Sequence, residues 1–440
     1  MLLVFAPLFR GGNRPMPLLL LEGVGLLGIA ALAWSRSPGL VVGALPATLR
    51  WGLVILLGAP LLQLIPIPTS WWLALPGREA YGGVLEVAGV GEGWRPLTIN
   101  ARATEYAWLA LIPCVAIFLL VQVLARRQVR ALALVFVGVA VFEAVLGIVQ
   151  VGVGKDSILT LGNPFGGGAA TGTYINKNHF AGLMAMALPV LLAFWAAETL
   201  PPLDRQGQRI REHPRHADAK LARRLLWSLL IVLALAALLF TWSRAGIGCG
   251  LAAFAAASLG LVWNAGALRV RVLLIAVAAA ALLLAVYAGI TPILDRFAPE
   301  ALSLSYEGRM RIALGAVRGG LDFLPFGSGL GTFADVFRRY QVEGLTGFID
   351  HAHNDYAEVF LELGVAGIAA VVLLAIAYVS RWGVLAGGKL SRSLGYLQVS
   401  AGLGVLALAA HGVFDFNFHI PANAIYFAFL AGIFFYEPPA

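Results

Sequence analysis

The chain has 440 residues, of which 60% are hydrophobic and only 12% are charged. This balance excludes an ordinary soluble domain, in which about a quarter of the residues carry charge. The net charge of +8 follows the basic connections between apolar segments, so we attribute it to membrane topology rather than to nucleic-acid binding.

Apolar runs of about 17–25 residues, the length with which a helix crosses the hydrocarbon core, recur along the chain. The sequence therefore predicts an all-α integral membrane protein with about 12 transmembrane helices. The spans are expected within 1–9 and near 16–35, 47–66, 104–124, 130–153, 178–198, 225–242, 245–263, 269–289, 355–380, 395–414 and 420–436.

Basic residues concentrate in a few connections, above all in 199–224. The positive-inside rule makes these connections cytoplasmic, and alternation along the chain then places both termini in the cytoplasm. Residues 290–354 fall on the opposite side as one large external loop. The chain is thus expected to comprise N-terminal transmembrane helices (1–289), this loop (290–354) and C-terminal transmembrane helices (355–440).

Carboxylates open the predicted helix that follows the external loop, in the stretch "IDHAHNDYAEVFLELG". Asn354 or Asp355 suits the N-cap because a side-chain oxygen there accepts hydrogen bonds from the amides of the first turn. Asp355, Glu358 and Glu362 then share one face of the helix. Since lipid penalises carboxylates strongly, we expect that face to point into the helix bundle.

Two histidines, His351 and His353, precede this helix at the membrane surface. They are either site residues or histidines that satisfy the loop backbone, and their spacing alone favours neither. No cysteine or repeated histidine–carboxylate pattern completes a ligand set around them, so no metal site is predicted.

Further polar side chains map to the same external side. They are contributed by the segments "TGTYINKNHFAG" (Asn178, His179), "TWSRAG" (Arg244) and "SYEGRMRI" (Arg309, Arg311). An arginine fork grips phosphate oxygens in pairs, and a neutral histidine can take a proton from an attacking hydroxyl. Arginines and a histidine at this depth therefore suit transfer of a sugar from a lipid-linked diphosphate.

Two other polar features are given no part in that chemistry. In the last external turn, "HGVFDFNFHIP", we interpret Asp415, Asn417 and His419 as solvated loop residues. Glu143 is the main acid within a predicted span, and the sequence names no partner for it. A transporter would show ionisable groups near the midplane and corresponding features in two halves. The polar residues lie instead mainly on the external side and in the C-terminal half. This distribution favours a reaction at one membrane face over transport.

Four stretches, in chain order, carry a resemblance to a known family: "TGTYINKNHFAG", "SRAG", "GRMRIALGAVRGGLDFLPFGSGLGTF" and "HAHNDYAEVFLELGVAG". From about Phe136 onward, the chain resembles the O-antigen ligase and polymerase superfamily of bacterial envelope glycosyltransferases. The resemblance implies a twelve-helix enzyme of the bacterial inner membrane, with a periplasmic active site beneath its large loop. It also implies an undecaprenyl-diphosphate-linked glycan as donor, an inverting mechanism, and no metal or other cofactor.

Carried over by motif, the resemblance assigns His353 as the catalytic base and Arg244 and Arg309 as ligands of the donor diphosphate. Arg311 and His351 match the motifs less securely; they are assigned a diphosphate-binding and a supporting role, respectively. The other supporting residues are Asn354, Asn178 and Glu358.

The resemblance leaves the acceptor open. A ligase transfers the glycan to a sugar of the lipid A core, a polymerase to a second lipid-linked repeat, and a protein O-oligosaccharyltransferase to a Ser or Thr hydroxyl. We favour the ligase, the family's usual activity, over polymerase and protein transfer, and keep a glycan flippase as the alternative of a different class. The expected partners are the glycan donor, its acceptor and membrane lipids.

Overall fold

The computed structural model describes residues 1–35, 43–154, 156–163, 168–199, 217–265, 279, 283, 299–342, 347–387 and 392–437. These residues are mostly helical, and among them the strands β1 (Pro66–Pro68) and β2 (Trp94–Pro96) form one antiparallel ribbon. The predicted span 269–289 lies outside the described residues, apart from positions 279 and 283.

Within the described residues, eight helical segments are long and apolar enough to cross a membrane. They are α2 (Pro15–Trp34), α7 with α8 (Ala101–Leu109 and Ile112–Val123), α9 (Arg126–Val153), α10 (Lys177–Thr199), α11 (Ala217–Phe240), α12 (Arg244–Ala265), α17 (Asp355–Gly387) and α18 (Arg392–His411). Each coincides with a predicted span. The expectation of a mostly helical chain with several helices suited to crossing a membrane is therefore confirmed.

The predicted count of 12 spans is not confirmed. The N-terminal residues form α1 (Leu2–Leu8), which has seven residues. At about 1.5 Å per residue, such a helix covers roughly a third of a ~30 Å hydrocarbon core. The helices α4 (Ala47–Gln63) and α19 (Pro421–Phe435) are apolar but shorter than the other spans.

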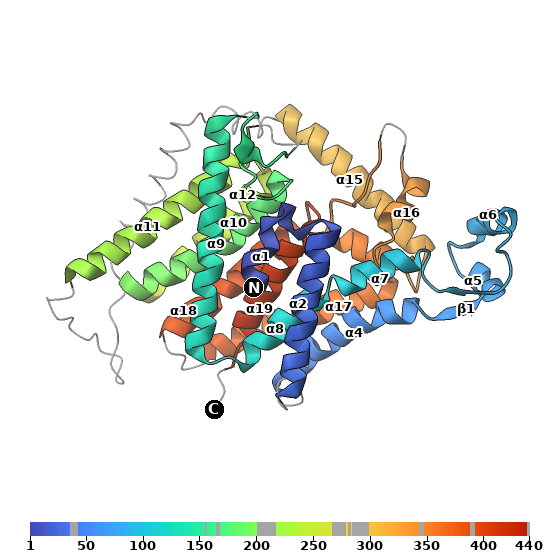
Figure 1. Cartoon of the computed structure of the whole chain (residues 1–440), viewed down its shortest axis with the longest axis horizontal. Coiled ribbons are helices and arrows are strands. Elements are labelled where there is room, and N and C mark those ends of the chain that lie inside the picture. Colours follow the sequence, from blue (N-terminus) through green and yellow to red (C-terminus); the bar gives the residue numbers. More distant parts are fainter. Residues whose placement is uncertain are drawn as a thin grey trace.

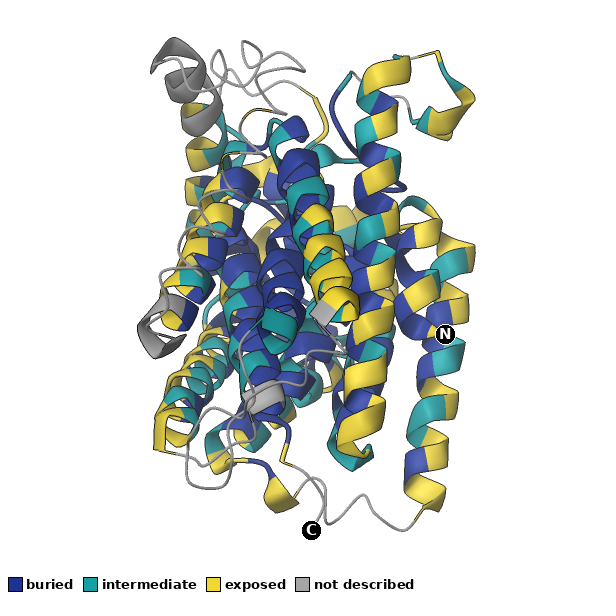
Figure 2. Cartoon of the chain, turned by 90° about the vertical axis from the view of Figure 1, so that its left-hand side faces the viewer, coloured by how far each residue is buried: buried dark blue, intermediate teal, exposed yellow. Residues whose placement is uncertain are grey.

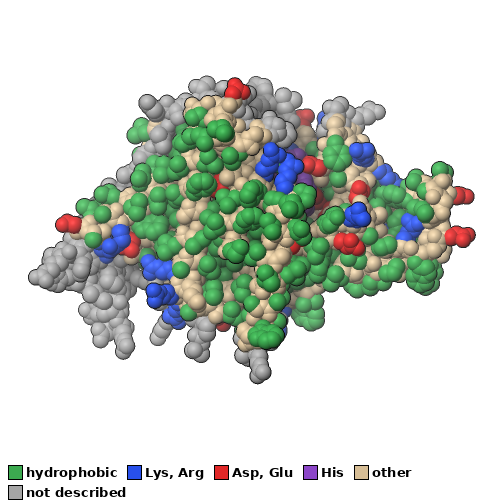
Figure 3. All heavy atoms as spheres, viewed as in Figure 1, with side chains coloured by type: hydrophobic (Ala, Val, Ile, Leu, Met, Phe, Trp, Pro, Cys, Tyr) green, Lys and Arg blue, Asp and Glu red, His purple; other side chains and the backbone are tan. Residues whose placement is uncertain are grey.

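Helix α10 lies at the centre of the bundle and is buried from Asn178 to Ala196. It packs against α18, α12, α11 and α9 (Figure 1). Figure 2 shows these buried helices surrounded by helices whose outward faces are exposed. Apolar side chains cover much of the face shown in Figure 3. Phe142 of α9 is one of the large apolar residues that are exposed. Lipid solvates such side chains, so this outer surface suits a membrane-embedded bundle.

The predicted external loop, 290–354, contains two α-helices where it is described. It forms α15 (Pro299–Asp322) and α16 (Phe333–Phe337), and α15 packs along α17. A second hydrophobic cluster that includes Phe323, Phe333 and Leu361 joins these three helices. The ribbon, α5 (Thr69–Ala74) and α6 (Gly82–Val87) form the right-hand extremity of Figure 1. The described part of 290–354 is thus a packed layer beside α17 rather than a long open loop.

The segment "GSGLGTF" forms the tight turns that its glycines predict, pressed against α17. Its Ser328 and Gly329 amides donate to the Leu361 and Glu362 carbonyls, each over 3.0 Å. Helix α17 kinks at Gly364, whose φ of 57° and ψ of −134° lie outside the helical region. A Cβ on Gly364 would collide with the Pro325 carbonyl oxygen. The close approach of two backbones therefore requires glycine here.

Glu143, for which the sequence named no partner, anchors the segment that leads into α10. Its buried carboxylate accepts hydrogen bonds from the Thr173 amide (2.8 Å) and the Thr173 hydroxyl (2.7 Å). Thr173 belongs to the motif "TGTYINKNHFAG", so this anchor fixes the chain that carries Asn178 and His179. Glu143 therefore has a structural role in positioning the start of α10.

Candidate active site

The start of α17 is capped as the sequence predicts. The Asn354 side-chain oxygen accepts hydrogen bonds from the amides of Tyr356 (3.1 Å) and Ala357 (3.0 Å). Its side-chain nitrogen donates to the Val413 carbonyl (3.0 Å), which ties the helix start to the turn after α18. The predicted carboxylate face is also confirmed, because Asp355, Glu358 and Glu362 are all buried.

Asp415, in the turn between α18 and α19, is fully buried and gathers polar side chains from distant segments. The Asn178 amide donates to its Oδ2 over 2.6 Å. His353 Nδ1 lies 3.3 Å from its Oδ1, and an Arg309 guanidinium nitrogen lies 3.5 Å from its Oδ2. His179 Nε2 is 3.9 Å from Oδ1. Four predicted external residues therefore meet at one carboxylate.

The Asp415 carboxyl is held ionised by these neighbours. Burial alone would raise its pKa, but the hydrogen bond from His353 and the electrostatic interactions with His179, Arg309 and His353 outweigh burial and lower the pKa well below its usual range. A buried anion needs such compensation, because an unpaired charge away from water is strongly unfavourable.

His353 is held in a defined orientation beside this anion. Its φ of 50° lies in the left-handed region, which is uncommon for a residue with a side chain. Because ionised Asp415 can only accept, Nδ1 must carry the proton in the 3.3 Å contact. In the neutral ring, Nε2 then bears the lone pair. About a quarter of the side chain is exposed, so this arrangement provides an accessible, oriented base.

Phe416 forms a common wall for three histidine rings. The His351 ring stacks on it at 4.3 Å between ring centres, while His179 and His353 meet it edge-on at 4.7 and 5.0 Å. Nothing in the sequence pattern singled out this phenylalanine. Its position fixes three imidazoles around one apolar surface next to Asp415.

A second cluster adjoins Phe416 through His351. Glu358 Oε1 is 2.8 Å from His351 Nδ1 and 3.2 Å from His419 Nε2. The other Glu358 oxygen accepts from the Ala352 amide over 2.7 Å. His419 Nδ1 in turn contacts Asp355 Oδ1 over 3.1 Å. His419 thus bridges two buried carboxylates.

This second cluster has the donor atoms of a metal site, which sequence spacing did not anticipate. The ligating atoms of His351, Glu358 and His419 all lie within 4.8 Å of one another. A proton on His419 can occupy the place of a metal ion in this cluster. Burial would lower the pKa of His419, but the Glu358 charge and the hydrogen bond to Asp355 raise it to about 10. A doubly protonated His419 therefore donates to both carboxylates and offsets one of their two negative charges.

The three predicted arginines are not equivalent. Arg309 donates to the Phe414 carbonyl over 2.8 Å, contacts Asp415, and keeps about a third of its side chain exposed. Arg311 is more exposed, and its described ion pair is with Glu307, four residues earlier, at 3.8 Å.

Arg244 is half-buried at the first residue of α12. Two residues later, Gly246 packs closely against Ala181 of α10 and His411 of α18. The start of α12 therefore adjoins the start of α10, which carries His179, and the end of α18, which precedes Asp415.

The interpretation of the last external turn as solvated loop was wrong. Asp415 and Asn417 are fully buried, and His419 is about one quarter exposed. The Asp355 carboxylate accepts from the Asn417 amide over 3.0 Å, and the Asp355 amide donates to the Gly412 carbonyl over 2.8 Å. These contacts fold the turn inward onto α17. The sequence feature that could have indicated burial of Asp415 is its position between two phenylalanines, in "FDF".

A family model described as O-antigen ligase matches residues 229–372. This segment runs from α11 into α17 and contains Arg244, Arg309, His353 and Glu358, but it ends before Asp415. The predicted family resemblance is therefore confirmed over residues 229–372. No curated protein matches the chain.

Proposed function

We propose, from the match of residues 229–372 to a family model described as O-antigen ligase, that the protein is a membrane glycosyltransferase with His353 as its catalytic base. It moves a glycan from undecaprenyl diphosphate to a hydroxyl of the lipid A core at the periplasmic face. The observation that carries this proposal is the 3.3 Å contact between His353 Nδ1 and buried Asp415. It is the arrangement that orients a histidine for proton abstraction.

The proposed step is a single inverting displacement. The acceptor hydroxyl oxygen attacks the anomeric carbon of the donor sugar, and its proton passes to His353 Nε2. The bond between that carbon and the diphosphate oxygen breaks, and the electron pair leaves with undecaprenyl diphosphate. Ionised Asp415 stabilises the imidazolium that forms, as a carboxylate does in other histidine-based sites.

The departing diphosphate needs fixed positive charge in this scheme. Arg309 supports that role because it is oriented by the Phe414 carbonyl while part of its fork remains exposed. Arg244 shares the role through its place at the start of α12. Arg311 is the weaker candidate, since its described partner is Glu307. With arginines compensating the leaving-group charge, no metal ion is required in the proposed step.

The supporting residues hold the base and its carboxylate in place. Asn354 caps the helix that follows His353, and Asn178 donates to Asp415. Glu358 fixes His351 through the 2.8 Å contact, and His351 stacks on the phenylalanine that also contacts the catalytic ring. Each acts on His353 through another group rather than on the sugar.

The test is glycan transfer by the purified full-length protein in nanodiscs containing an undecaprenyl-diphosphate-linked glycan. Lipid A core, a second lipid-linked repeat and a Ser-containing peptide are offered separately, with EDTA present. We expect transfer to lipid A core, and its loss in a folded His353→Ala variant by on the order of a hundred- to ten-thousand-fold.

Each alternative has its own signature in this experiment. Transfer only to the second repeat would identify a polymerase, and transfer only to the peptide would identify a protein glycosyltransferase. Undiminished transfer by His353→Ala would remove His353 as the base. No transfer to any acceptor, with the glycan crossing a sealed vesicle membrane, would make the protein a flippase.

A further inference from the structure

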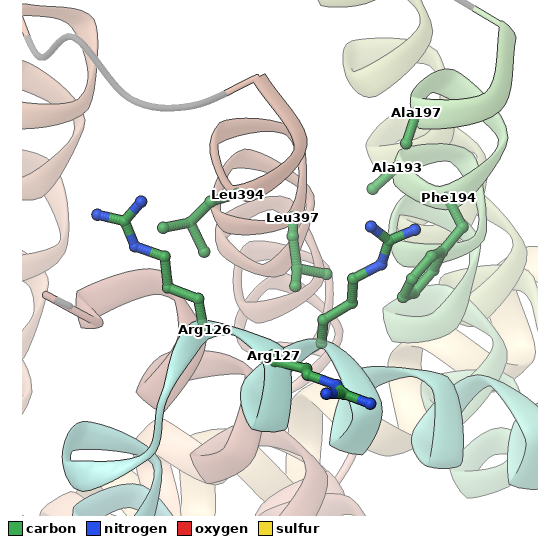
Figure 4. Close-up of a pocket in the computed structure, with 8 residues that line it drawn as sticks. Arg126, Arg127, Ala193, Phe194, Ala197, Leu394 and Leu397 are labelled. Atoms are coloured by element: carbon green, nitrogen blue, oxygen red, sulfur yellow. The ribbon is translucent and has the colours of Figure 1, made fainter.

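A basic hollow, drawn in Figure 4, is formed by the start of α9, the end of α10 and the start of α18, whereas the candidate active site lies at the other ends of α10 and α18. It has a volume of about 270 Å³, and its walls come from α9, α10 and α18. It is lined by Arg126, Arg127, Arg130, Ala193, Phe194, Ala197, Leu394 and Leu397. Phe194 follows the site residue Asn178 by 16 positions on α10, which corresponds to roughly 24 Å along the helix axis. The hollow is therefore separate from the Asp415 cluster.

Three exposed arginines make one side of the hollow positive. No described carboxylate pairs with Arg126, Arg127 or Arg130 in the part of the chain that the structure covers. Glu198, on the last turn of α10, is occupied by Arg223 over 2.9 Å. The Arg130 guanidinium lies 5.9 Å from the centre of the Phe194 ring. The three arginines thus bring positive charge to the α9 wall of the hollow, although the Arg127 guanidinium points away from the labelled apolar side chains in Figure 4.

The other side of the hollow is lined by apolar side chains. Figure 4 shows Arg126 rising beside Leu394 and Leu397, with Phe194 and Ala197 on the α10 side. These apolar residues end helices that are long enough to span a membrane. Guanidinium groups next to apolar helix ends lie where phospholipid phosphates meet acyl chains.

We propose that this hollow binds the phosphate headgroup of an anionic phospholipid. The arginines hold the phosphate oxygens, and the leucine and phenylalanine side chains contact the adjoining glycerol and upper acyl chain. A volume of about 270 Å³ lies at the lower limit of ordinary small-molecule pockets. It accommodates a headgroup, whereas a lipid-linked glycan needs far more room. Free phosphate would leave the apolar wall unused. The inference is independent of the proposed transferase activity.

The test is a lipid titration of the full-length protein in mild detergent, followed by native mass spectrometry. Phosphatidylglycerol is compared with zwitterionic phosphatidylcholine, each with and without millimolar inorganic phosphate. We expect preferential retention of phosphatidylglycerol that inorganic phosphate does not abolish. Replacing all three arginines (Arg126→Gln, Arg127→Gln and Arg130→Gln) should weaken phosphatidylglycerol binding on the order of a hundredfold, at about fivefold per arginine.

A matched control removes the same charge elsewhere. Arg14, Arg102 and Arg318 are exposed outside the hollow, and changing all three to Gln should leave phosphatidylglycerol retention at the wild-type level. If the hollow variant fails to fold, Arg130→Gln alone should still weaken binding about fivefold. Equal losses in the two triple variants would overturn the site, because they would indicate general charge attraction. Complete displacement by inorganic phosphate would replace the lipid with a small-anion site.

Discussion

Asp415 accepts a 2.6 Å hydrogen bond from the side-chain amide of Asn178, a residue 237 positions earlier in the chain. The bond joins the first turn of α10 to the turn after α18. Asp415 also contacts His353 and Arg309 through its two oxygens. One buried carboxylate therefore sets the relative position of the proposed base and a proposed diphosphate ligand.

Replacing Asp415 with Asn should reduce turnover far more than it reduces donor binding. The amide is nearly isosteric, but it cannot hold Nδ1–H of His353 as an anion does. His353 then loses its preferred tautomer and the stabilisation of its charged form. We expect kcat to fall on the order of a thousandfold or more, as in other carboxylate–histidine pairs, with a much smaller change in KM.

Steady-state transfer assays on Asp415→Asn check this prediction, with Asp350→Asn as the control. Asp350 is an exposed acid three residues before His353, and its variant should retain wild-type kinetics. A folded Asp415→Asn protein with normal kcat would mean that Asp415 only stabilises the fold.

Substitutions of the α15 arginines should differ in their effect on donor use, because the side chains have different contacts. Arg309→Lys retains the charge but loses the planar fork that contacts both the Phe414 carbonyl and Asp415. We expect the KM for the lipid-linked donor to rise by roughly tenfold or more, the loss of about one charge-assisted hydrogen bond. Arg311→Lys should have a smaller effect, and Arg318→Lys on the same exposed side should have none.

Donor titrations of the three variants at saturating acceptor give this order. An effect of Arg311→Lys as large as that of Arg309→Lys would instead make both residues diphosphate ligands, as the family resemblance implies.

The helices and half of the site could be predicted because their signals are local. Apolar length predicts a span, and the Asn354 cap and the buried face of Glu358 follow from the geometry of a single helix. Asp415 could not be predicted as buried, because its environment is created by Asp355 and Gly412, which fold the last turn inward. A polar turn is expected to be solvated when only its sequence is considered. The contacts that bury Asp415 are tertiary and cannot be read from the turn itself.

The convergence of His351, Glu358 and His419 was missed for a similar reason. His351 and Glu358 are neighbours in sequence, but His419 arrives from the next connection between helices. Sequence spacing therefore showed two members of a three-member cluster, too few to suggest a ligand set.

The second cluster makes a pH prediction that distinguishes a proton from a metal. The pKa of His419 is raised to about 10, against about 6.5 in an unfolded chain. Its stabilisation is therefore fully present below pH ~6.5 and is lost as the pH rises through about 10. We expect the melting temperature to fall more steeply across this range for the wild type than for His419→Gln, with EDTA present throughout.

Repeating the melts with zinc in place of EDTA tests the other occupant. A metal needs His351 and His419 deprotonated, so metal stabilisation would grow with rising pH, opposite to that of the proton. Zinc-dependent stabilisation that is lost in His419→Gln would show that the cluster binds a metal.

Glu143 should contribute to folding and not to transfer. Glu143→Leu removes the acceptor for the buried Thr173 amide, so we expect the free energy of unfolding to drop by about 1–3 kcal/mol. Glu143→Gln retains an acceptor oxygen, and its transfer rate per folded molecule should match the wild type. A well-folded Glu143→Gln protein that loses activity would indicate that a titratable group is needed at this position, as in ion-coupled transport.

The kink of α17 predicts how a single substitution at Gly364 changes stability. Gly364→Ala introduces a Cβ at a φ of 57° and against the Pro325 carbonyl, so either the kink or the "GSGLGTF" turn must move. We expect a loss of at least about 2 kcal/mol in the free energy of unfolding. Gly383 lies on the same helix with no atom close to its Cβ position, and Gly383→Ala should be neutral or stabilising by up to about 1 kcal/mol. Thermal melts of the two variants in one detergent give the comparison. Equal stability would mean that α17 can straighten at Gly364 without disturbing the turn that packs against it.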